Sequence, residues 1–356
     1  MKKYSWVLLI LYFGLFVVFG LIFYFKYLDR FLKSGAEPQP VETPESADYI
    51  YYSESNNLFR LRPELQLDPT NPERVERFQS TGVVNYVDIN KTGNLLAYEV
   101  KTSQGLREIW QVDTATNESA KIAFQGKEGL ADFQEFSRPK FSPDSRRLAF
   151  IGLGSIDQII IYDFTRETLT PVTKQFALKF TDFTWEDSQK IIFCTRNLLP
   201  NLCYEVDLVD NAERKILEAD ASQLAMSQSG LIYLAKDQDS ANLYLLDLNT
   251  LQSSSISDLK APKKVNRFSL DKNAQKIVYE VADGNFSDIY FARTDGSNKI
   301  QLTIDGGSTM AILNPNGEEV AFQKIFDGIY SIKLDQYDQK KIVNMPGKQV
   351  NMLLWR

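Results

Sequence analysis

Short stretches in which apolar and polar residues alternate recur along most of the chain, in pairs separated by a polar turn. Residues 268–280, "FSLDKNAQKIVYE", contain an apolar strand, an Asp-Lys-Asn-Ala turn and a second strand ending near an aromatic residue. Alternation with a period of two is typical of a strand with one buried face, so this pattern predicts a β-hairpin. Related hairpins occupy residues 87–99, 141–151, 183–194, 224–234 and 312–323.

The second strands of these hairpins carry aromatic residues that recur every 40–52 residues. These aromatics are Tyr98, Phe150, Phe193, Tyr233, Tyr279 and Phe322. Each hairpin is followed by a third apolar stretch, such as "IIIYD" or "LYLLD", then by a polar turn and a short fourth strand. Four strands in about 44 residues is the repeat of a β-propeller blade, whose sheet buries both faces only against neighbouring blades.

The two ends of the repeat region predict how the ring closes. Residues 48–62 supply a second and a third strand without a first, whereas residues 349–355 supply a first strand with nothing after it. Pairing these segments completes one blade and removes an open sheet edge. We therefore expect an all-β, seven-bladed β-propeller over residues 48–356. An open sandwich or barrel of short strands is the alternative, and the regular period disfavours it.

An uncharged apolar segment precedes the repeats. Residues 4–25 carry no charge, and a helix of this length spans roughly 33 Å, enough to cross the ~30 Å hydrocarbon layer of a bilayer. We expect a transmembrane signal-anchor helix here, after a cytoplasmic stub of residues 1–3. A cleaved signal peptide is the alternative, but the apolar run is long and no cleavage site follows it directly. Residues 26–47 form a juxtamembrane segment and a linker rich in Pro and Glu.

The distribution of charge restricts the possible partners. The chain carries a net charge of −6, to which residues 1–33 contribute +4, so residues 34–356 carry −10. The charged residues of the first segment are Lys2, Lys3, Lys26, Asp29, Arg30 and Lys33. An acidic domain without a run of basic residues binds nucleic acid poorly, because phosphate contacts dominate that affinity. We therefore do not expect nucleic acid as a partner.

The chain contains no histidine, which excludes Ser-His-Asp and Cys-His catalysis within it and removes the commonest transition-metal ligand. A facing pair of carboxylates could still perform glycosidase chemistry, but the sequence singles out no pair among its 46 acidic residues. Asp237 and Asp239 resemble half of a calcium loop, but the Gly and distal Glu are missing, which favours a solvated hairpin tip. We expect no metal, no cofactor and no enzymatic activity.

The two cysteines of the chain, Cys194 and Cys203, lie on the predicted second and third strands of one blade. If residues 196–201 form the hairpin loop, the two side chains face each other across the strand pair. A disulfide at this position would indicate an oxidising, extracytoplasmic compartment. Two small buried thiols are the alternative, and the sequence leaves both open.

Several loops on one predicted face of the propeller contain apolar residues. They are the loops at 125–136, 196–201, 281–288 and 324–328, which join second to third strands or successive blades. Apolar side chains gathered at loop tips indicate a partner surface, and aromatic residues anchor many interfaces. The candidate partner-binding residues are Phe133, Phe136, Leu198, Leu199, Phe286, Ile325 and Phe326. The alternative for each of them is that it folds back over a blade edge.

The units "FSPDSRRLAF" (141–150) and "FSLDKNAQKIVYEVADGNFSDIYFARTDGSNKIQLT" (268–303) resemble the repeat of TolB-type, WD40-like β-propellers. In that family, Ser-Pro-Asp-Gly turns precede "IAF"-like strands and "IY" opens the third strand. The resemblance implies a propeller and a bacterial protein. It does not imply the TolB role, because we expect no α/β domain like the one that precedes the TolB propeller. The propellers of prolyl oligopeptidases and dipeptidyl peptidases are also similar, but we expect no hydrolase domain in a chain that ends at Arg356.

Two functions of different classes fit these patterns. The first is a membrane-tethered, non-catalytic scaffold that holds another envelope or membrane protein, which predicts an exposed apolar patch on one face. The alternative is a propeller that binds or cleaves a small ligand or glycan in its central channel, which predicts convergent carboxylates and aromatics on the first strands. The absence of histidine favours the scaffold. We expect a single-pass protein of the cytoplasmic membrane, in contact with the bilayer through residues 4–25 and with its propeller on the extracytoplasmic side.

Overall fold

The computed structural model describes residues 49–54, 56–62, 75–78, 82–173, 179–196, 201–237 and 239–355. The chain divides between residues 47 and 48, and all described residues belong to the second part. The predictions of a cytoplasmic stub, a membrane anchor and a linker in residues 1–47 lie outside the described residues. In the part of the chain that is described, no helix is long and apolar enough to cross a membrane.

The described residues form antiparallel strands that repeat in groups of four. The first strands are β4 (Gly82–Ile89), β8 (Phe133–Phe141), β12 (Phe180–Trp185), β16 (Ala221–Ser227), β20 (Lys264–Leu270), β24 (Ser308–Leu313) and β28 (Met352–Trp355). The second strands are β1 (Ile50–Glu54), β5 (Leu95–Thr102), β9 (Arg147–Gly154), β13 (Lys190–Thr195), β17 (Gly230–Asp237), β21 (Lys276–Asp283) and β25 (Glu319–Lys324).

The other two positions of each group are filled by strands further from the centre of the ring. The third strands are β2 (Asn57–Leu61), β6 (Arg107–Asp113), β10 (Gln158–Asp163), β14 (Leu202–Asp207), β18 (Ser240–Leu246), β22 (Phe286–Arg293) and β26 (Gly328–Lys333). The fourth strands are β3 (Val75–Phe78), β7 (Ser119–Ala123), β11 (Thr168–Pro171), β15 (Glu213–Glu218), β19 (Ser253–Ser255), β23 (Ile300–Gln301) and β27 (Gln339–Asn344).

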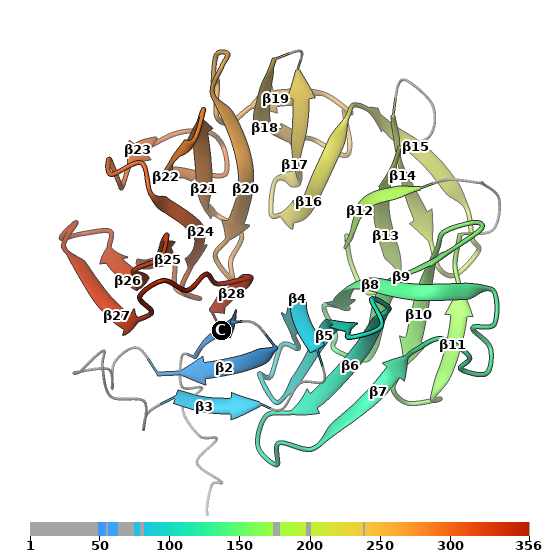
Figure 1. Ribbon diagram of the computed structural model, residues 1–356. Coiled ribbons are helices and arrows are strands. Elements are labelled where there is room, and N and C mark those ends of the chain that lie inside the picture. Colours follow the sequence, from blue (N-terminus) through green and yellow to red (C-terminus); the bar gives the residue numbers. More distant parts are fainter. Residues whose placement is uncertain are drawn as a thin grey trace, which may run out of the picture. The chain divides into compact units, whose positions relative to one another are not determined.

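Within the described residues, these strands form five sheets of four strands and one sheet of eight. The eight-stranded sheet contains two antiparallel groups, β16–β19 and β20–β23, joined by a single parallel pair of Ala241 with Lys264. At the ends of the described chain, β28 pairs antiparallel with β1, so that Trp355 lies opposite Ile50. The sheets follow one another around a ring, and consecutive first strands such as β4 and β8 contact each other on its inner side (Figure 1).

In five of the groups, the aromatic residue of the second strand stacks on the aromatic residue opposite it on the third strand. Tyr233 lies opposite Tyr244 with 5.3 Å between the ring centroids, and Tyr279 lies opposite Tyr290 with 5.7 Å. Directly opposed residues in an antiparallel pair are close enough for such contacts, which stabilise the pairing and its register. The aromatic spacing in the sequence therefore reports a cross-strand contact repeated from sheet to sheet.

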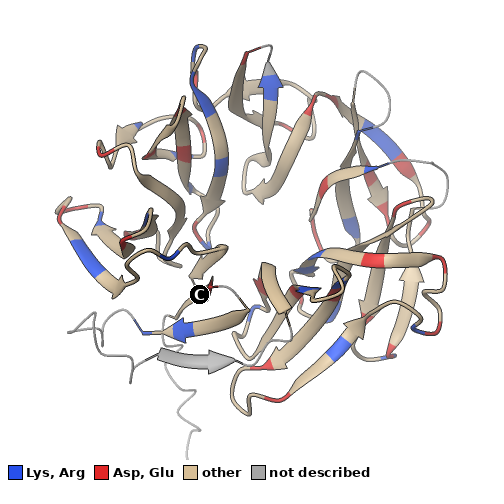
Figure 2. Ribbon diagram, in the orientation of Figure 1, with Lys and Arg blue, Asp and Glu red and all other residues tan. Residues whose placement is uncertain are grey.

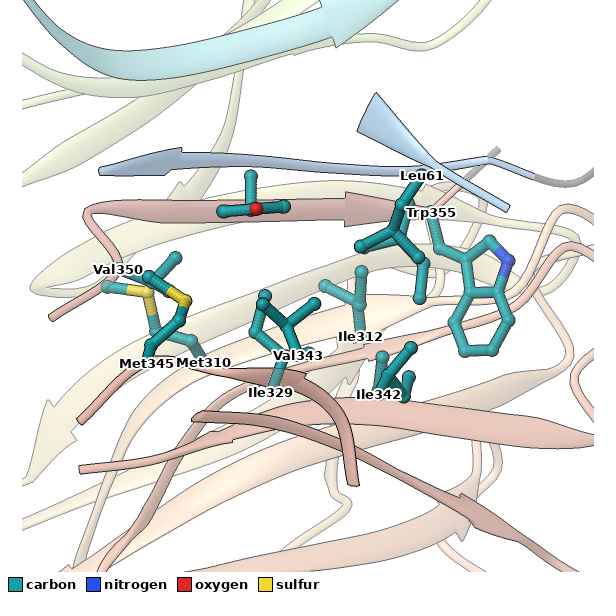
Figure 3. Close-up of a cluster of buried hydrophobic side chains, with 12 residues drawn as sticks. Leu61, Met310, Ile312, Ile329, Ile342, Val343, Met345, Val350 and Trp355 are labelled. Carbon is teal, nitrogen blue, oxygen red and sulfur yellow. The ribbon is translucent and has the colours of Figure 1, made fainter. Parts of the chain in front are cut away.

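The core lies between the sheets rather than within any one of them. Seven clusters of buried apolar residues occur among the described residues, and each contains side chains from two consecutive groups of strands. In the cluster shown in Figure 3, Trp355 of β28 and Leu61 of β2 lie beside Ile312 of β24 and Ile342 of β27. Each sheet thus buries both of its faces against its neighbours.

Buried polar side chains also join consecutive groups. Glu99, directly after the aromatic of β5, accepts hydrogen bonds from the Ser137 hydroxyl (2.6 Å) and the Arg138 backbone N–H (3.3 Å) of β8. Glu280, at the same position of β21, accepts one from the Met310 N–H of β24 at 3.1 Å. Arg138 and Met310 have φ values of 58° and 56° and lie at irregularities in their strands. These carboxylates therefore satisfy N–H groups that the ladder leaves unpaired.

In two other groups of strands, the residue directly after the aromatic of the second strand has a smaller or neutral side chain that also forms a hydrogen bond. The Ser53 hydroxyl donates to the Val84 carbonyl of the next group at 3.0 Å, and the Gln323 amide donates to the Lys348 carbonyl at 3.4 Å. The remaining second strands carry Ile151, Cys194 and Leu234 here. A position one residue beyond the aromatic thus contributes to the contact between sheets, by hydrogen bonds in four groups and by burial in the other three.

Candidate partner-binding face

Four exposed apolar side chains gather on neighbouring loops at one end of the strands. They are Phe286, Ile304, Ile325 and Phe326, with 67%, 87%, 38% and 61% of their surfaces exposed. Phe286 is the first residue of β22, directly after the turn that follows β21. Ile304 lies in the loop between β23 and β24, and Ile325 and Phe326 lie in the turn between β25 and β26. We call these four residues the apolar loop face. Apolar residues grouped in this way are typical of a binding surface, whereas single exposed ones are common.

Backbone hydrogen bonds tie the loops of the apolar loop face to one another. The Ser287 N–H donates to the Gly306 carbonyl at 2.9 Å, and the Ile325 N–H donates to the Gly307 carbonyl at the same distance. The Gly347 N–H then donates to the Phe326 carbonyl at 2.8 Å. The four apolar side chains are therefore presented by a connected backbone, which reduces the conformational entropy lost when a partner binds.

Two aspartates order the loop that carries Ile304. Asp288 accepts hydrogen bonds from the Thr303 hydroxyl (3.0 Å) and the Gly306 N–H (3.1 Å), and Asp305 accepts one from the Ser308 hydroxyl (2.8 Å). Aspartates that bond nearby backbone and hydroxyl groups stabilise tight turns. Ile304 is thus highly exposed although the loop around it is held in place.

Phe286 lies against the backbone of this loop. A side chain at Gly306, whose φ is 68°, would place its Cβ 2.8 Å from a ring carbon of Phe286. Glycine is needed here for the positive φ and for this close approach. The ring of Phe286 therefore lies over Gly306 with its other side exposed to solvent.

Phe326 occupies a backbone conformation that disfavours a bulky side chain. Its φ is 61°, in the left-handed region, where residues with a Cβ are destabilised by roughly 1–2 kcal/mol. Asparagine or glycine at this turn would avoid that cost and would also remove an exposed aromatic ring. The same two features, exposure and a positive φ, also coincide at Leu251 and Tyr337, which lie in turns between third and fourth strands.

The structure separates the residues that the sequence predicted for this surface. The exposure predicted for Phe286, Ile325 and Phe326 is confirmed. The prediction is wrong for Phe133 and Phe136, which belong to β8 and are buried against the preceding sheet. A register irregularity between Phe133 and Glu135 allows both rings, three residues apart, to enter the same core cluster.

Two predicted residues and one missed residue complete this comparison. Leu198 and Leu199 lie outside the described residues. Ile304 was not predicted, although it is the most exposed large apolar residue among those described. The signal was an isoleucine beside the turn sequence "DGG" (305–307), where an apolar side chain has no strand to pack on.

A cluster of polar residues, separate from the apolar loop face, lies on the first strands of three consecutive groups. The guanidinium of Arg138 lies 4.9 Å from the Tyr86 ring centroid and 3.2 Å from the carboxylate of Asp182. Lys140 also pairs with Asp182 at 3.1 Å, and the Leu224 N–H donates to it at 2.9 Å. Burial opposes ionisation of Asp182, but Lys140 and Arg138 lower its pKa below the usual value. This carboxylate is therefore held ionised by groups of the protein itself.

Three buried carboxylates of the first and second strands are engaged by other groups of the protein. Glu99 and Glu280 are buried and bonded to neighbouring strands, as described above, and so is Asp182. Among the described residues, no group of three or more acidic or cysteine side chains could hold a metal ion. Asp239, one of the two residues compared with a calcium loop, lies in the turn between β17 and β18. Charged residues of both signs are interspersed around the ring (Figure 2).

Glu186 and Glu205 are hydrogen-bonded to each other beside the turn that joins β12 to β13. Burial and the charge of Glu205 raise the pKa of Glu186. Glu205 is partly buried, but Arg214 at 2.7 Å and Lys190 at 3.2 Å lower its pKa. A directly bonded pair leaves no room for a sugar between the two groups, so we assign the pair no glycosidase role.

Glu186→Gln is expected to raise the thermal midpoint at neutral pH and to change it little near pH 4. The pKa of Glu186 is higher in the folded state, so the stabilisation that its proton provides is lost as pH rises above the unfolded value. An amide keeps the hydrogen bond to Glu205 and removes the charge. Thermal melts of both proteins across this pH range test the prediction, and an equal shift at all pH values would contradict it.

Cys194 and Cys203 lie directly opposite each other on β13 and β14 and form a disulfide. The register is the one predicted from a loop at 196–201, and the Cα atoms are 4.0 Å apart. Both cysteines are buried and contact the next group of strands through a cluster that includes Leu224 and Tyr233. The bridge therefore takes the place that hydrogen-bonding side chains fill in other groups.

No protein-family model matches this chain, and neither does any curated protein. Solved structures do match. TolB from Acinetobacter baumannii is 16% identical with a TM-score of 0.51, over 71% of this chain and 63% of TolB. The β-propeller domain of the Trilobed protease from Pyrococcus furiosus is 14% identical with a TM-score of 0.61, over 84% of this chain and 95% of that domain. The fold is a β-propeller.

Other propellers of similar geometry belong to proteins with different activities. Oligogalacturonate lyase from Vibrio parahaemolyticus is 11% identical with a TM-score of 0.60, over 82% of this chain and 85% of the lyase. A prolyl endopeptidase matches over 87% of this chain, which spans only 50% of the endopeptidase chain. Identities this low concern the fold alone, because one fold supports many functions.

Proposed function

We propose that this protein is a non-catalytic, protein-binding scaffold of a bacterial cell envelope. In this proposal, residues 48–356 form a seven-bladed β-propeller closed by the pairing of β28 with β1. Residues 4–25 hold it in the cytoplasmic membrane, with the propeller on the extracytoplasmic side. The seven groups of four strands and the seven core clusters between them support the blade number. The Cys194–Cys203 bridge supports the compartment.

The observation that carries the binding function is Phe326. Its ring is exposed and its backbone is left-handed, a combination that Leu251 and Tyr337 share, but Phe326 also belongs to the four exposed apolar side chains of the apolar loop face. Ile325 lies in the same turn, and backbone hydrogen bonds connect this turn through the loop of Ile304 to that of Phe286. A preformed apolar centre of this kind, with polar residues around it, is the usual anatomy of a protein-binding surface.

Cross-linking in membranes followed by affinity purification of the full-length protein tests this proposal. We expect a stoichiometric envelope or membrane protein with the wild type and its loss with Phe286→Ser/Phe326→Ser. The matched control is Val209→Ser/Tyr337→Ser, which removes two equally exposed apolar residues from turns between third and fourth strands. Recovery of the same partner with both double variants, or of no partner with the wild type, would refute the scaffold.

Phe326→Asn is expected to separate stability from binding. Relief of the left-handed backbone should increase the free energy of unfolding by about 0.5–1 kcal/mol, since asparagine adopts this conformation more easily. Recovery of the partner should fall at least about tenfold, as expected for an aromatic hot spot. Urea titration and the cross-linking assay measure the two effects. A variant that is less stable than wild type, or that binds equally well, would contradict this interpretation of Phe326.

A further inference from the structure

Every loop that contributes to the apolar loop face also contributes an aspartate. These are Asp283 at the turn after β21, Asp305 in the loop before β24 and Asp327 in the turn after β25. Each lies within three residues of an exposed apolar side chain of the face. Acidic and large apolar groups therefore alternate along this row of loops.

Each aspartate is paired with a lysine, but the carboxylate is the more exposed member of each pair. The pairs are Lys263–Asp283 (4.0 Å), Lys324–Asp305 (2.9 Å) and Lys341–Asp327 (2.5 Å). For the last pair, the exposed fractions of the side chains are 47% for Asp327 and 27% for Lys341. The aspartate side chains therefore remain accessible to an approaching molecule although each is paired with a lysine. The long-range field also attracts cations, because residues 34–356 carry a net charge of −10.

The carboxylates of Asp305 and Asp327 remain ionised at neutral pH. Hydrogen bonds from Lys341 and Tyr330 lower the pKa of Asp327. Partial burial opposes this effect at Asp305, but the Lys324 ammonium and the Ser308 hydroxyl still lower its pKa. Both carboxylates are therefore available to attract a cation from a partner.

We propose that the apolar loop face binds a short segment of a partner protein in which large apolar side chains are flanked by Lys or Arg. This inference rests on the proposed scaffold function and adds the chemistry of the partner. The apolar side chains of the segment cover Phe286, Ile304, Ile325 and Phe326, and its cations lie beside the three aspartates. An anionic bilayer surface fits poorly, because lipid phosphates would lie beside the carboxylates.

Two matched peptides test the partner chemistry. One is a fluorescein-labelled peptide with Leu and Phe anchors flanked by Lys, and the other has Glu in place of every Lys. Each is titrated against the full-length protein in nanodiscs of neutral phosphatidylcholine, and binding is followed by fluorescence anisotropy. We expect the Lys peptide to bind at least about tenfold more tightly, with the difference decreasing as salt is added.

Double variants distinguish the contribution of charge to peptide binding from the contribution of apolar contact. Asp305→Asn/Asp327→Asn keeps one oxygen on each side chain, which can still accept from the Gly307 N–H and the Tyr330 hydroxyl, while the contacts with Lys324 and Lys341 are lost. This double variant should bind the Lys peptide several-fold more weakly than the wild type does. The ratio of its affinities for the Lys peptide and the Glu peptide should therefore be smaller. Asp335→Asn/Asp338→Asn removes the same charge from the exposed turn between β26 and β27 and should change neither. Phe286→Ser/Phe326→Ser should abolish binding of both peptides.

The outcomes distinguish this inference from the proposed function. Equal binding of the two peptides, or no effect of Asp305→Asn/Asp327→Asn, overturns the basic segment while cross-linking to a partner can still succeed. Failure of cross-linking together with failure of both peptides overturns the scaffold as well. Capture of vesicles containing phosphatidylglycerol, if Phe286→Ser/Phe326→Ser abolishes it, overturns the inference in favour of a bilayer surface.

Discussion

Glu280→Ala is expected to lower the free energy of unfolding by about 3 kcal/mol, because it leaves the buried Met310 N–H and the partly buried Thr309 hydroxyl without an acceptor. The Glu280 carboxylate accepts hydrogen bonds from the Thr309 hydroxyl and the Met310 N–H of the next group, and from the Asn266 amide of its own group. Arg267, 3.7 Å away, also loses its ion pair. Equilibrium urea titration followed by tryptophan fluorescence measures the change.

Two variants control for the loss of a glutamate as such. Glu280→Gln keeps one oxygen acceptor and nearly the same volume, so it should cost less than half as much as Glu280→Ala. Glu318→Ala removes an exposed glutamate of the adjacent hairpin and should fall within about 0.5 kcal/mol of wild type. If Glu280→Ala proved no more harmful than Glu318→Ala, the carboxylate would not be holding consecutive blades together.

Reduction of the Cys194–Cys203 bridge is expected to lower the free energy of unfolding by about 2.5 kcal/mol. The bridge spans a sequence separation of nine residues, and closing a loop of that length restricts the unfolded chain by about this amount in the chain-entropy model. Urea titrations with and without reductant, on protein purified under oxidising conditions, measure the effect.

The variant Cys194→Ala/Cys203→Ala serves as the control for the bridge. Its free energy of unfolding should not change when reductant is added. That free energy should be close to the value of the reduced wild type. Free thiols in protein isolated from its own cell compartment would contradict the extracytoplasmic location, since that compartment favours oxidation.

The strand plan of this protein follows from local patterns in the sequence. The hairpin at 268–280 and the opposition of Cys194 and Cys203 depend on residues about a dozen positions apart or fewer. Period-two alternation and polar turns act over the same short range, so they can be recognised in a single chain. No pattern in the sequence assigned a role to Ser53, Glu99, Glu280 and Gln323, each of which follows the aromatic residue of its second strand.

Only part of the apolar loop face could be predicted, because the sequence does not show whether an apolar residue beside a loop packs on a neighbouring sheet. Phe133 and Phe286 both follow polar loop residues, yet one is buried and the other exposed. Each is the first residue of a strand, β8 for Phe133 and β22 for Phe286. Phe133 packs against the preceding sheet because β8 contains register irregularities that turn its side chain inward. Ile304 has no such strand to pack on, and its loop is held outward by Asp288 and Asp305.

By itself, the sequence determined that this chain repeats a four-stranded antiparallel unit and which residues face each other within a hairpin. Those features depend on alternation, turn residues and spacing, all of which act between neighbours along the chain. Only the tertiary structure decided which loop residues stay exposed, which glutamates join one sheet to the next, and how Phe326 comes to lie on a left-handed turn. Burial and hydrogen bonding between sheets involve residues about 30 to 40 positions apart, and no local pattern specifies which of them meet.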